Sequence, residues 1–300
     1  MERKQARQCP VSEEESGQKL FAYLKRRLGR EFPGSGLMRM IRTGQVRVNS
    51  RRSKPYDRIF AGDIIRIPPH FPEIPDDPAR AGDLDIFYEH RDFLVLKKPA
   101  GVPVHSGTSA RRDNMVLRLR KHFAGVEFSP TLVHRLDKDT SGLLLVARNY
   151  AWLKKMHQTW VKGGVEKTYL AWIAGRWPEG WTRLEHRLAR KQDKVISSPE
   201  GRYALSWIRP VMENSDRTLL LVSIATGRTH QIRAQLAFSG TPVLGDDKYG
   251  GGRISGQGML LHAFRLVWSG YDFRLRPEWA GEFSPPGDIV SRVLTPESGT

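Results

Sequence analysis

A proline-rich stretch near residue 70 constrains the fold of this 300-residue chain more than any other feature. Five prolines lie between residues 68 and 78. Proline fixes its own φ angle and has no backbone N–H, so this stretch can continue neither a helix nor the interior of a sheet. We therefore expect a stiff linker at residues 71–83 that separates a small domain at 12–70 from a larger one at 84–300.

The charge of the chain is unevenly distributed. The net charge is +17, and residues 1–70 carry 16 Lys and Arg against seven Asp and Glu, which is more than half of the excess. A diffuse basic surface for solubility or a membrane-facing patch would also give a high net charge. Clustering in less than a quarter of the chain favours a nucleic-acid partner.

Composition narrows the class of protein further. Hydrophobic residues make up 39% of the chain, which suffices for a packed core. The apolar runs are far shorter than the ~18 residues of a membrane span, and the N-terminus has no apolar segment typical of a secretory signal. The single cysteine, Cys9, excludes an internal disulfide and a cysteine-based zinc site. We expect a cytoplasmic protein without an obligate protein partner.

Hydrophobic periodicity predicts the elements of the N-terminal part. Leu20, Leu24 and Leu28 recur at helical spacing, and Gly44 fits the position after a helix where a left-handed backbone is needed. We expect helices at 16–28 and 37–43, separated by a break at 34–36, and strands at 45–48 and 64–67.

Beyond residue 84, strands and helices mix without regular alternation. This pattern predicts an α+β domain with a mixed, largely antiparallel central sheet rather than a doubly wound fold. We expect helices at 114–123 and 150–161, and strands at 86–88, 93–96, 132–133, 143–146, 168–173, 219–224 and 260–266.

Elimination leaves carboxylates and arginines as the groups that carry chemistry. A zinc deaminase needs paired cysteines, the nine histidines are scattered, and no phosphate-binding loop, dinucleotide fingerprint or serine elbow is present. We therefore expect neither a metal nor a cofactor.

The densest polar segment, residues 134–142, contains two aspartates, Asp137 and Asp139. An aspartate can act as a nucleophile without a metal if a nearby cation keeps it ionised in a closed pocket. Arg228 or Arg233, in the second polar segment, could supply that charge, or both could contact phosphate.

Several segments together resemble a known family. The run His134-Arg135-Leu136-Asp137-Lys138-Asp139-Thr140-Ser141-Gly142 resembles the signature of the RluA-type pseudouridine synthases. Residues 85–103 and 167–171 resemble the opening strands and the tyrosine-bearing strand of their catalytic domain. Residues 12–67 resemble an S4 RNA-binding domain. The resemblance covers nearly the whole chain after residue 12 and is closest to the large-subunit ribosomal RNA branch (RluC- and RluD-like).

The resemblance implies a role for particular residues. Asp137 would attack the target nucleoside, Arg135 would fill the gap left by a flipped base, and Tyr169 would pack against the uracil ring and take part in proton movement. Arg233 would pair with Asp137, and Arg228 would contact the substrate. Histidines 134, 230 and 262 are interpreted as structural hydrogen-bonding groups. In the S4-like domain the expected RNA contacts are Arg39, Arg42, Arg47 and Arg51.

The resemblance thus implies isomerisation of specific uridines to pseudouridine, with 23S ribosomal RNA or its precursor as partner. The sequence leaves open attack at C1′, addition to the base, or removal of a C2′ proton. Alternatives are the same reaction on transfer RNA, a non-catalytic ribosome assembly factor built on an S4 module, and a two-carboxylate glycosidase.

Overall fold

The computed structural model describes residues 6–28, 34–68, 81–105, 113–124, 126, 128–214 and 216–290. Contacts divide the chain into two compact units. The first comprises 1–95, 105–134 and 145–158, and the second 96–104, 135–144 and 159–300. Residues 71–80, most of the predicted linker, lie outside the described residues.

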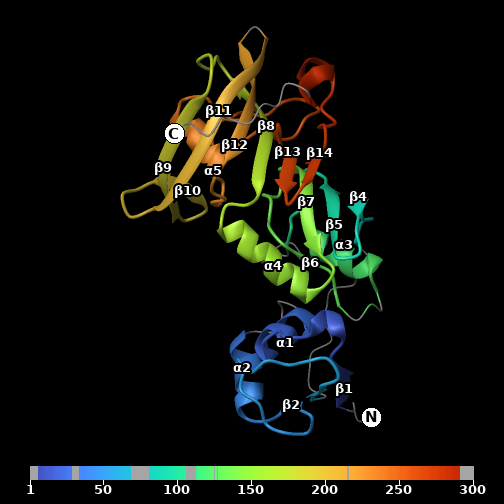
Figure 1. The fold of residues 1–300 in the computed structure, drawn as a ribbon. Helices are drawn as coiled ribbons and strands as arrows, with labels where there is room; N and C mark the ends of the chain where they lie inside the picture. Colours follow the sequence, from blue (N-terminus) through green and yellow to red (C-terminus); the bar gives the residue numbers. More distant parts are fainter. Residues whose placement is uncertain are drawn as a thin grey trace. The chain divides into compact units, whose positions relative to one another are not determined.

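The N-terminal part of the first unit is a three-stranded antiparallel sheet with helices (Figure 1). Its strands follow the order β1-β3-β2, and a core that includes Leu20, Leu24, Leu37 and Ile41 lies beneath the helices. Its elements are β1 (Arg7–Pro10), η1 (Glu13–Glu15), α1 (Leu20–Leu28), α2 (Gly34–Arg42), β2 (Arg47–Val48) and β3 (Ile64–Ile67).

The predicted helices and strands are present here, but β1 was not predicted and two helix boundaries were wrong. The first helix begins at Leu20 rather than at residue 16, because the backbone at Gly17 turns to a φ of 80°. Residues 34–36 form the first turn of α2 instead of a break. Glycine is tolerated there because the first N–H groups of a helix lack intrahelical partners. Gly44 has the predicted positive φ, at 75°.

The large sheet has 11 strands, and its order confirms the mixed, mostly antiparallel arrangement. The main path is β10-β9-β11-β12-β8-β13-β7-β5-β4, with β14 beside β13 and β6 beside β7. The β13–β7 pair is parallel. The strands are β4 (Ile86–Glu89), β5 (Phe93–Lys98), β6 (Thr131–Leu132), β7 (Ser141–Ala147), β8 (Glu166–Ala174), β9 (Thr182–Lys191), β10 (Lys194–Ser197), β11 (Arg202–Asn214), β12 (Arg217–Ile224), β13 (Leu261–Trp268) and β14 (Tyr271–Arg274).

Three α-helices accompany these strands in the part of the chain that the structure describes. The predicted ones are present as α3 (Met115–His122), which Asn114 caps by accepting a hydrogen bond from the Leu117 amide, and α4 (Tyr150–Val161). The helix α5 (Gln231–Phe238), the strands β9 to β11 and the strand β14 were not predicted. Two short 3₁₀ helices, η3 (Gly281–Phe283) and η4 (Gly287–Val290), follow β14. No helix in the described part of the chain is long and apolar enough to span a membrane.

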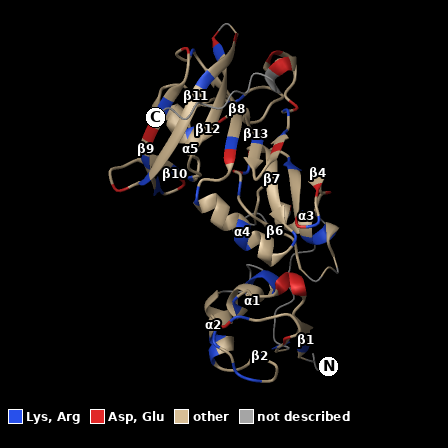
Figure 2. Cartoon of the chain, in the orientation of Figure 1, with Lys and Arg blue, Asp and Glu red and all other residues tan. Residues whose placement is uncertain are grey.

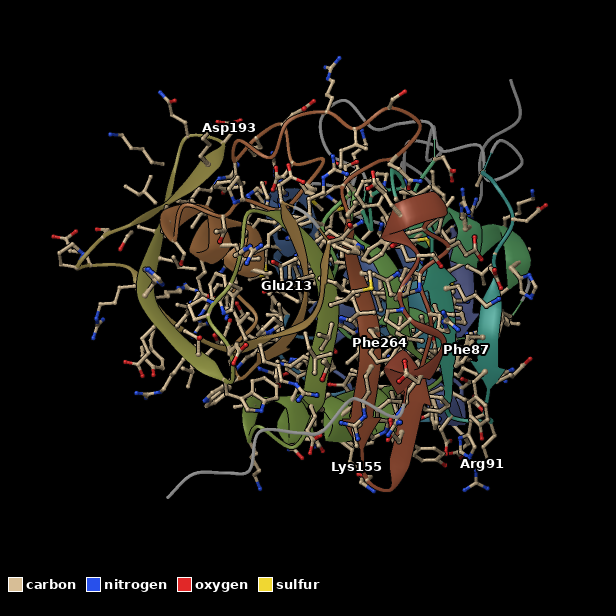
Figure 3. All side chains as sticks on the ribbon, turned by 90° about the horizontal axis from the view of Figure 1, so that it is seen from above. Phe87, Arg91, Lys155, Asp193, Glu213 and Phe264 are labelled. Atoms are coloured by element: carbon tan, nitrogen blue, oxygen red, sulfur yellow. The ribbon has the colours of Figure 1, made fainter. Side chains whose placement is uncertain are left out.

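The core of the second unit forms around β8. Leu170 and Trp172 of this strand pack with Leu219, Leu221 and Phe264 from the two flanking strands. Phe264 is fully buried and lies inside the fold in Figure 3. The buried indole of Trp172 donates a hydrogen bond to the Phe283 carbonyl at 2.9 Å, which satisfies its polar atom.

Gly142, at the start of β7, lies where two backbones nearly touch. It pairs with Ala263 of β13, and a Cβ atom at Gly142 would lie 2.3 Å from the Ala263 carbonyl oxygen. Its φ of 116° is in the region that favours glycine. This close approach fixes the end of the polar loop 134–140 against β13.

Replacing Gly142 by alanine is therefore expected to destabilise the fold by about 3 kcal/mol or more, from backbone strain and steric overlap. Urea unfolding would measure the change. Gly227→Ala is the matched control, since its Cβ would meet no atom within 4 Å. The control should stay within about 1 kcal/mol of the wild type. Equal stability of the two variants would contradict this account.

Candidate active site

A buried lysine holds the backbone of the loop that carries Asp137. Lys98, at the end of β5, is 1% exposed and donates hydrogen bonds from Nζ to the carbonyls of Pro99, Lys138 and Thr140 at 2.8, 2.8 and 2.7 Å. Leu136 and Thr140, on either side of Asp137, are also buried. The aspartate side chain itself is 18% exposed, so a clamped backbone presents a partly accessible carboxylate.

Arg233 joins Asp137 to a second carboxylate. Its Nη1 lies 3.1 Å from Asp137 Oδ2, while Nε and Nη2 bind the two oxygens of Asp246 at 2.6 and 2.8 Å. Burial alone would lower the pKa of Arg233, but the hydrogen bonds and charge of Asp246, with the charge of Asp137, raise it. The guanidinium therefore stays charged. Of the two arginines that the sequence offered, the structure brings Arg233 to Asp137.

The unpredicted helix α5 delivers Arg233. The turn before it is tied by Gln231, whose Oε1 accepts hydrogen bonds from the Thr226 hydroxyl and the Arg228 amide at 2.8 and 3.0 Å. The Gln231 amide group donates to the Leu205 carbonyl at 3.0 Å, which anchors the turn on β11. Arg228 is exposed and donates to the Tyr203 carbonyl at 2.8 Å, so it lies apart from Asp137.

Asp246 is the most buried carboxylate of the site, with 1% of its side chain exposed. Besides Arg233 it accepts hydrogen bonds from the amides of Lys248 and Tyr249 at 3.1 and 3.3 Å. The Tyr249 ring lies 5.2 Å from the Arg233 guanidinium, a cation–π contact. No local sequence pattern indicates that Asp246 holds the arginine.

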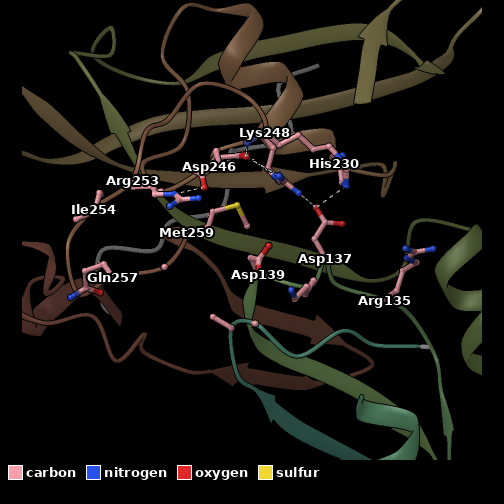
Figure 4. Close-up of a pocket in the computed structure, with 17 residues that line it drawn as sticks. Arg135, Asp137, Asp139, His230, Asp246, Lys248, Arg253, Ile254, Gln257 and Met259 are labelled. Atoms are coloured by element: carbon pink, nitrogen blue, oxygen red, sulfur yellow. Dashed lines mark hydrogen bonds and ion pairs between the residues drawn. The ribbon is translucent and has the colours of Figure 1, made fainter. Parts of the chain in front are cut away.

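The remaining predicted site residues take different positions. Arg135 is exposed and lines the same pocket as Asp137 (Figure 4). Tyr169 lies on β8 between Val222 of β12 and Ala263 of β13, and is 8% exposed. Burial first, and then the charge of Asp137, raise the pKa of its hydroxyl. Tyr169 is not among the 17 described residues that line the pocket.

The pocket has a volume of about 860 Å³, and all of its lining residues belong to the second unit. Its polar lining mixes both signs of charge. The described residues hold no group of three or more His, Cys, Asp and Glu side chains that could bind a metal ion. The charged lining residues are Arg135, Asp137, Lys138, Asp139, Arg233, Asp246, Asp247, Lys248 and Arg253.

Two of the three histidines interpreted as structural have that place in the fold. His134 Nε2 accepts a hydrogen bond from the Leu145 amide at 3.0 Å. His262 lies between the Ser141 hydroxyl and the Leu275 carbonyl, at 2.8 and 2.9 Å. His230 differs, because it lines the pocket with its Nε2 3.9 Å from Asp137 Oδ2.

Known proteins are similar to this chain in sequence and in fold. Residues 92–238 match the family described as RNA pseudouridylate synthase. Ribosomal large subunit pseudouridine synthase C of Pasteurella multocida is 34% identical over 91% of this chain and 86% of its own length. The protein of the same name from Escherichia coli is 34% identical over 80% of this chain and 78% of its own. The structure of human RNA pseudouridylate synthase domain containing 1 has a TM-score of 0.53 and 27% identity, over 64% of this chain and 82% of that one.

The pKa of His262 predicts how stability depends on pH. Burial lowers this pKa to about 4, although the Leu275 carbonyl opposes the shift. The unfolded chain, with an ordinary histidine, binds the proton more readily, so stability falls as pH drops from about 6.5 towards 4. Through this histidine the free energy of unfolding should decrease by about 2 kcal/mol between pH 7 and pH 5.

Urea unfolding at the two pH values measures this loss, with His262→Gln as the comparison. Glutamine can retain one donor and one acceptor but does not titrate. The variant should be less stable at pH 7 and lose less than the wild type on acidification. An equal loss in both proteins would show that other groups cause it.

Proposed function

Because the chain belongs to the RNA pseudouridylate synthase family, we propose that it isomerises uridine in large-subunit ribosomal RNA and that Asp137 is its nucleophile. The curated relatives named above carry that RNA in their names. The carboxylate of Asp137, held by Arg233 at 3.1 Å inside a pocket, is the observation that carries the assignment. We place the reaction in the cytoplasm.

The buried arginine suits this role for Asp137. A carboxylate in a poorly solvated pocket tends to take up a proton, and a fixed cation beside it favours the ionised form. Arg233 is itself neutralised by Asp246, so it approaches Asp137 without leaving an unpaired buried charge. Asp139 lines the same pocket but has an exposed side chain. The geometry therefore supports Asp137 over Asp139.

The target uridine has to leave the RNA stack to reach this pocket. Flipping a base costs a few kcal/mol, and less in an unpaired segment. Arg135 is exposed, lines the pocket and lies two residues before Asp137. We assign it to the gap that the flipped base leaves, where its planar guanidinium can stack on the neighbouring bases.

The isomerisation exchanges one bond for another. The bond between N1 and C1′ breaks, the uracil turns within the closed site, and C5 joins C1′. The C5 proton is then lost and N1 gains one, so reactant and product have the same composition. Asp137 can assist by attacking C1′, by adding to the base or by removing the C2′ proton. In each case the trapped base must keep its orientation, which is the task of a closed pocket.

Tyr169 does not line the pocket itself, but it is near enough to Asp137 for that charge to act on its hydroxyl, and we assign it to the uracil ring from β8. Burial, and then the charge of Asp137, raise the pKa of its hydroxyl, so the phenol keeps its proton in the free protein. For it to accept the C5 proton, the bound substrate must first lower that pKa. Tyr169 thus belongs to the step after the uracil has turned.

Residues 12–70 are proposed to be an S4-type RNA-binding domain, joined by the linker 71–83 to the catalytic domain 84–300. Its expected RNA contacts, Arg39, Arg42, Arg47 and Arg51, are all exposed. Figure 2 shows Lys and Arg residues on α1 and α2. Exposed Arg228 is assigned to a phosphate rather than to the reacting base.

The assignment of Asp137 predicts the behaviour of two aspartate variants. Asp137→Ala should slow pseudouridine formation by at least about 10⁴-fold, the scale of losing a nucleophile, while RNA binding persists. The matched control is Asp139→Ala, which should keep at least about a tenth of the wild-type rate because Asp139 is exposed.

Pseudouridine mapping tests both variants and the target. Cells without the gene, complemented with either variant, are compared at every uridine of ribosomal and transfer RNA. Sites in large-subunit ribosomal RNA should disappear with Asp137→Ala alone. Loss confined to transfer RNA would reject the ribosomal target, and modification by Asp137→Ala would reject the nucleophile.

The S4 assignment predicts the salt dependence of RNA binding. Replacing Arg39 and Arg47 by glutamine should make the slope of log affinity against log salt concentration shallower by about 1–2, because each phosphate contact contributes about 0.7–0.9. The control replaces Arg91 and Arg176, which are exposed outside residues 12–70; Arg91 points outward in Figure 3. Equal slopes for both double variants would reject this assignment.

A further inference from the structure

His230 faces the proposed nucleophile, a position that a purely structural histidine does not require. Its Nε2 lies 3.9 Å from Asp137 Oδ2, and its side chain is 17% exposed. Its φ of 52° places it in the left-handed region, which residues other than glycine seldom adopt. Such strain persists only where the surroundings hold the residue, and it concentrates at functional sites.

Tyr249 and Asp137 lie at opposite ring nitrogens of His230 and together favour one tautomer. The Tyr249 hydroxyl oxygen accepts a hydrogen bond from the Val195 amide at 2.8 Å and lies 2.9 Å from His230 Nδ1. The hydroxyl can donate its single hydrogen to Nδ1, and we assign this arrangement because of the carboxylate on the other side of the ring. The neutral ring then carries its own hydrogen on Nε2, directed to Asp137. The other tautomer would set a lone pair against a carboxylate.

Arg233 and His230 approach the same oxygen of Asp137. Nη1 of the arginine lies 3.1 Å and Nε2 of the histidine 3.9 Å from Oδ2 (Figure 4). Within the described part of the chain, no residue donates a hydrogen bond to Oδ1. The two oxygens are therefore inequivalent, and the lone pairs of Oδ1 remain free.

We propose that His230 is a positioning residue: with Arg233 it holds Oδ2 of Asp137, so that Oδ1 is the oxygen presented to the target nucleotide. This inference rests on the proposed role of Asp137 as nucleophile. The gap of 3.9 Å closes to a hydrogen bond with a small rotation of the carboxyl group when RNA is bound. Tyr249 acts one step further away, through the tautomer of His230.

The charges around His230 keep its ring neutral. Burial lowers its pKa, the cations of Arg233 on α5 and Lys248 lower it further, and Asp137 and Asp246 oppose the shift. Tyr249 adds a neutral hydroxyl, since burial raises its pKa. Acidification would protonate Nδ1, turn the Tyr249 hydroxyl away and set a second cation at Oδ2, which makes the carboxylate less reactive. The rate of the chemical step should therefore decrease at pH values below the ordinary titration range of histidine.

Single-turnover rates on a large-subunit ribosomal RNA transcript, followed by tritium release from C5 between pH 5 and pH 8, test this. His230→Ala should lower the rate at saturating RNA about tenfold to a hundredfold, the scale of a misplaced reacting group, with the RNA affinity within twofold. His230→Gln should recover part of the rate, since its amide can donate to Oδ2. Its rate should also lack the acid loss caused by histidine.

Tyr249→Phe keeps the ring over Arg233 but removes the hydroxyl. Because this hydroxyl acts through His230, the double variant with His230→Gln should be no slower than His230→Gln alone. Independent, multiplying effects would overturn the inference. The matched control is His186→Gln, a histidine with a lowered pKa that does not line the pocket. Its rate and pH profile should follow the wild type.

Failure of this inference differs from failure of the proposed function. If Asp137→Ala is inactive while both His230 variants keep the wild-type rate and pH profile, His230 is structural and the inference is wrong. An active Asp137→Ala variant would reject the nucleophile itself. Thermal melting separates folding from positioning; if His230→Ala does not fold, the glutamine and phenylalanine variants decide the matter.

Discussion

The site depends on the ion pairs that the buried guanidinium of Arg233 forms with Asp246 and Asp137. A lone buried cation would be costly, and a lone buried carboxylate would take up a proton. Asp246 satisfies two N–H groups of Arg233, and a third N–H remains for Asp137. The arrangement leaves one net negative charge, and Asp137 is the more exposed of the two carboxylates that share it. Replacing Asp246 would thus change the electrostatic environment of Asp137 through Arg233, although Asp246 makes no direct contact with Asp137 in the site described above.

The fold brings these charges together from distant parts of the second unit. Lys98, on β5, fixes the backbone around Asp137 through three carbonyls, and the Gly142–Ala263 contact fixes where that loop enters β7. Arg233 comes from α5, whose entry turn is tied to β11 by Gln231. Contacts to the loop backbone therefore fix where the Asp137 carboxylate lies, independently of the side chains that line the pocket.

Sequence patterns revealed most of the strands but less of the site. Alternating and continuous apolar runs gave β5, β7, β8, β12 and β13, whose residues bury their side chains. The strand β9 contains many charged residues and is largely exposed, and β11 mixes apolar with polar residues and is only partly buried, so neither forms a clear apolar run. The helix α5 is mostly buried, but the polar residues Gln231 and Arg233 interrupt the apolar pattern that would have indicated it. Asp137 and Arg233 were paired through the family resemblance. The contacts of Asp246, Lys98 and His230 depend on three-dimensional proximity, which no local pattern encodes.

A carboxylate nucleophile that acts on a polyanion faces an electrostatic conflict, since RNA phosphates repel it. The cations that line the pocket can offset this repulsion, but some of them are already paired with carboxylates. Lys248 and Arg253 are paired with Asp193, at the turn between β9 and β10 (Figure 3), and with Asp247. Among the described residues no carboxylate pairs with Arg135 or Lys138, which flank Asp137 in the sequence and line its pocket. With Asp137 as the proposed nucleophile, these two cations would place an attraction for phosphates beside the carboxylate that has to approach the RNA.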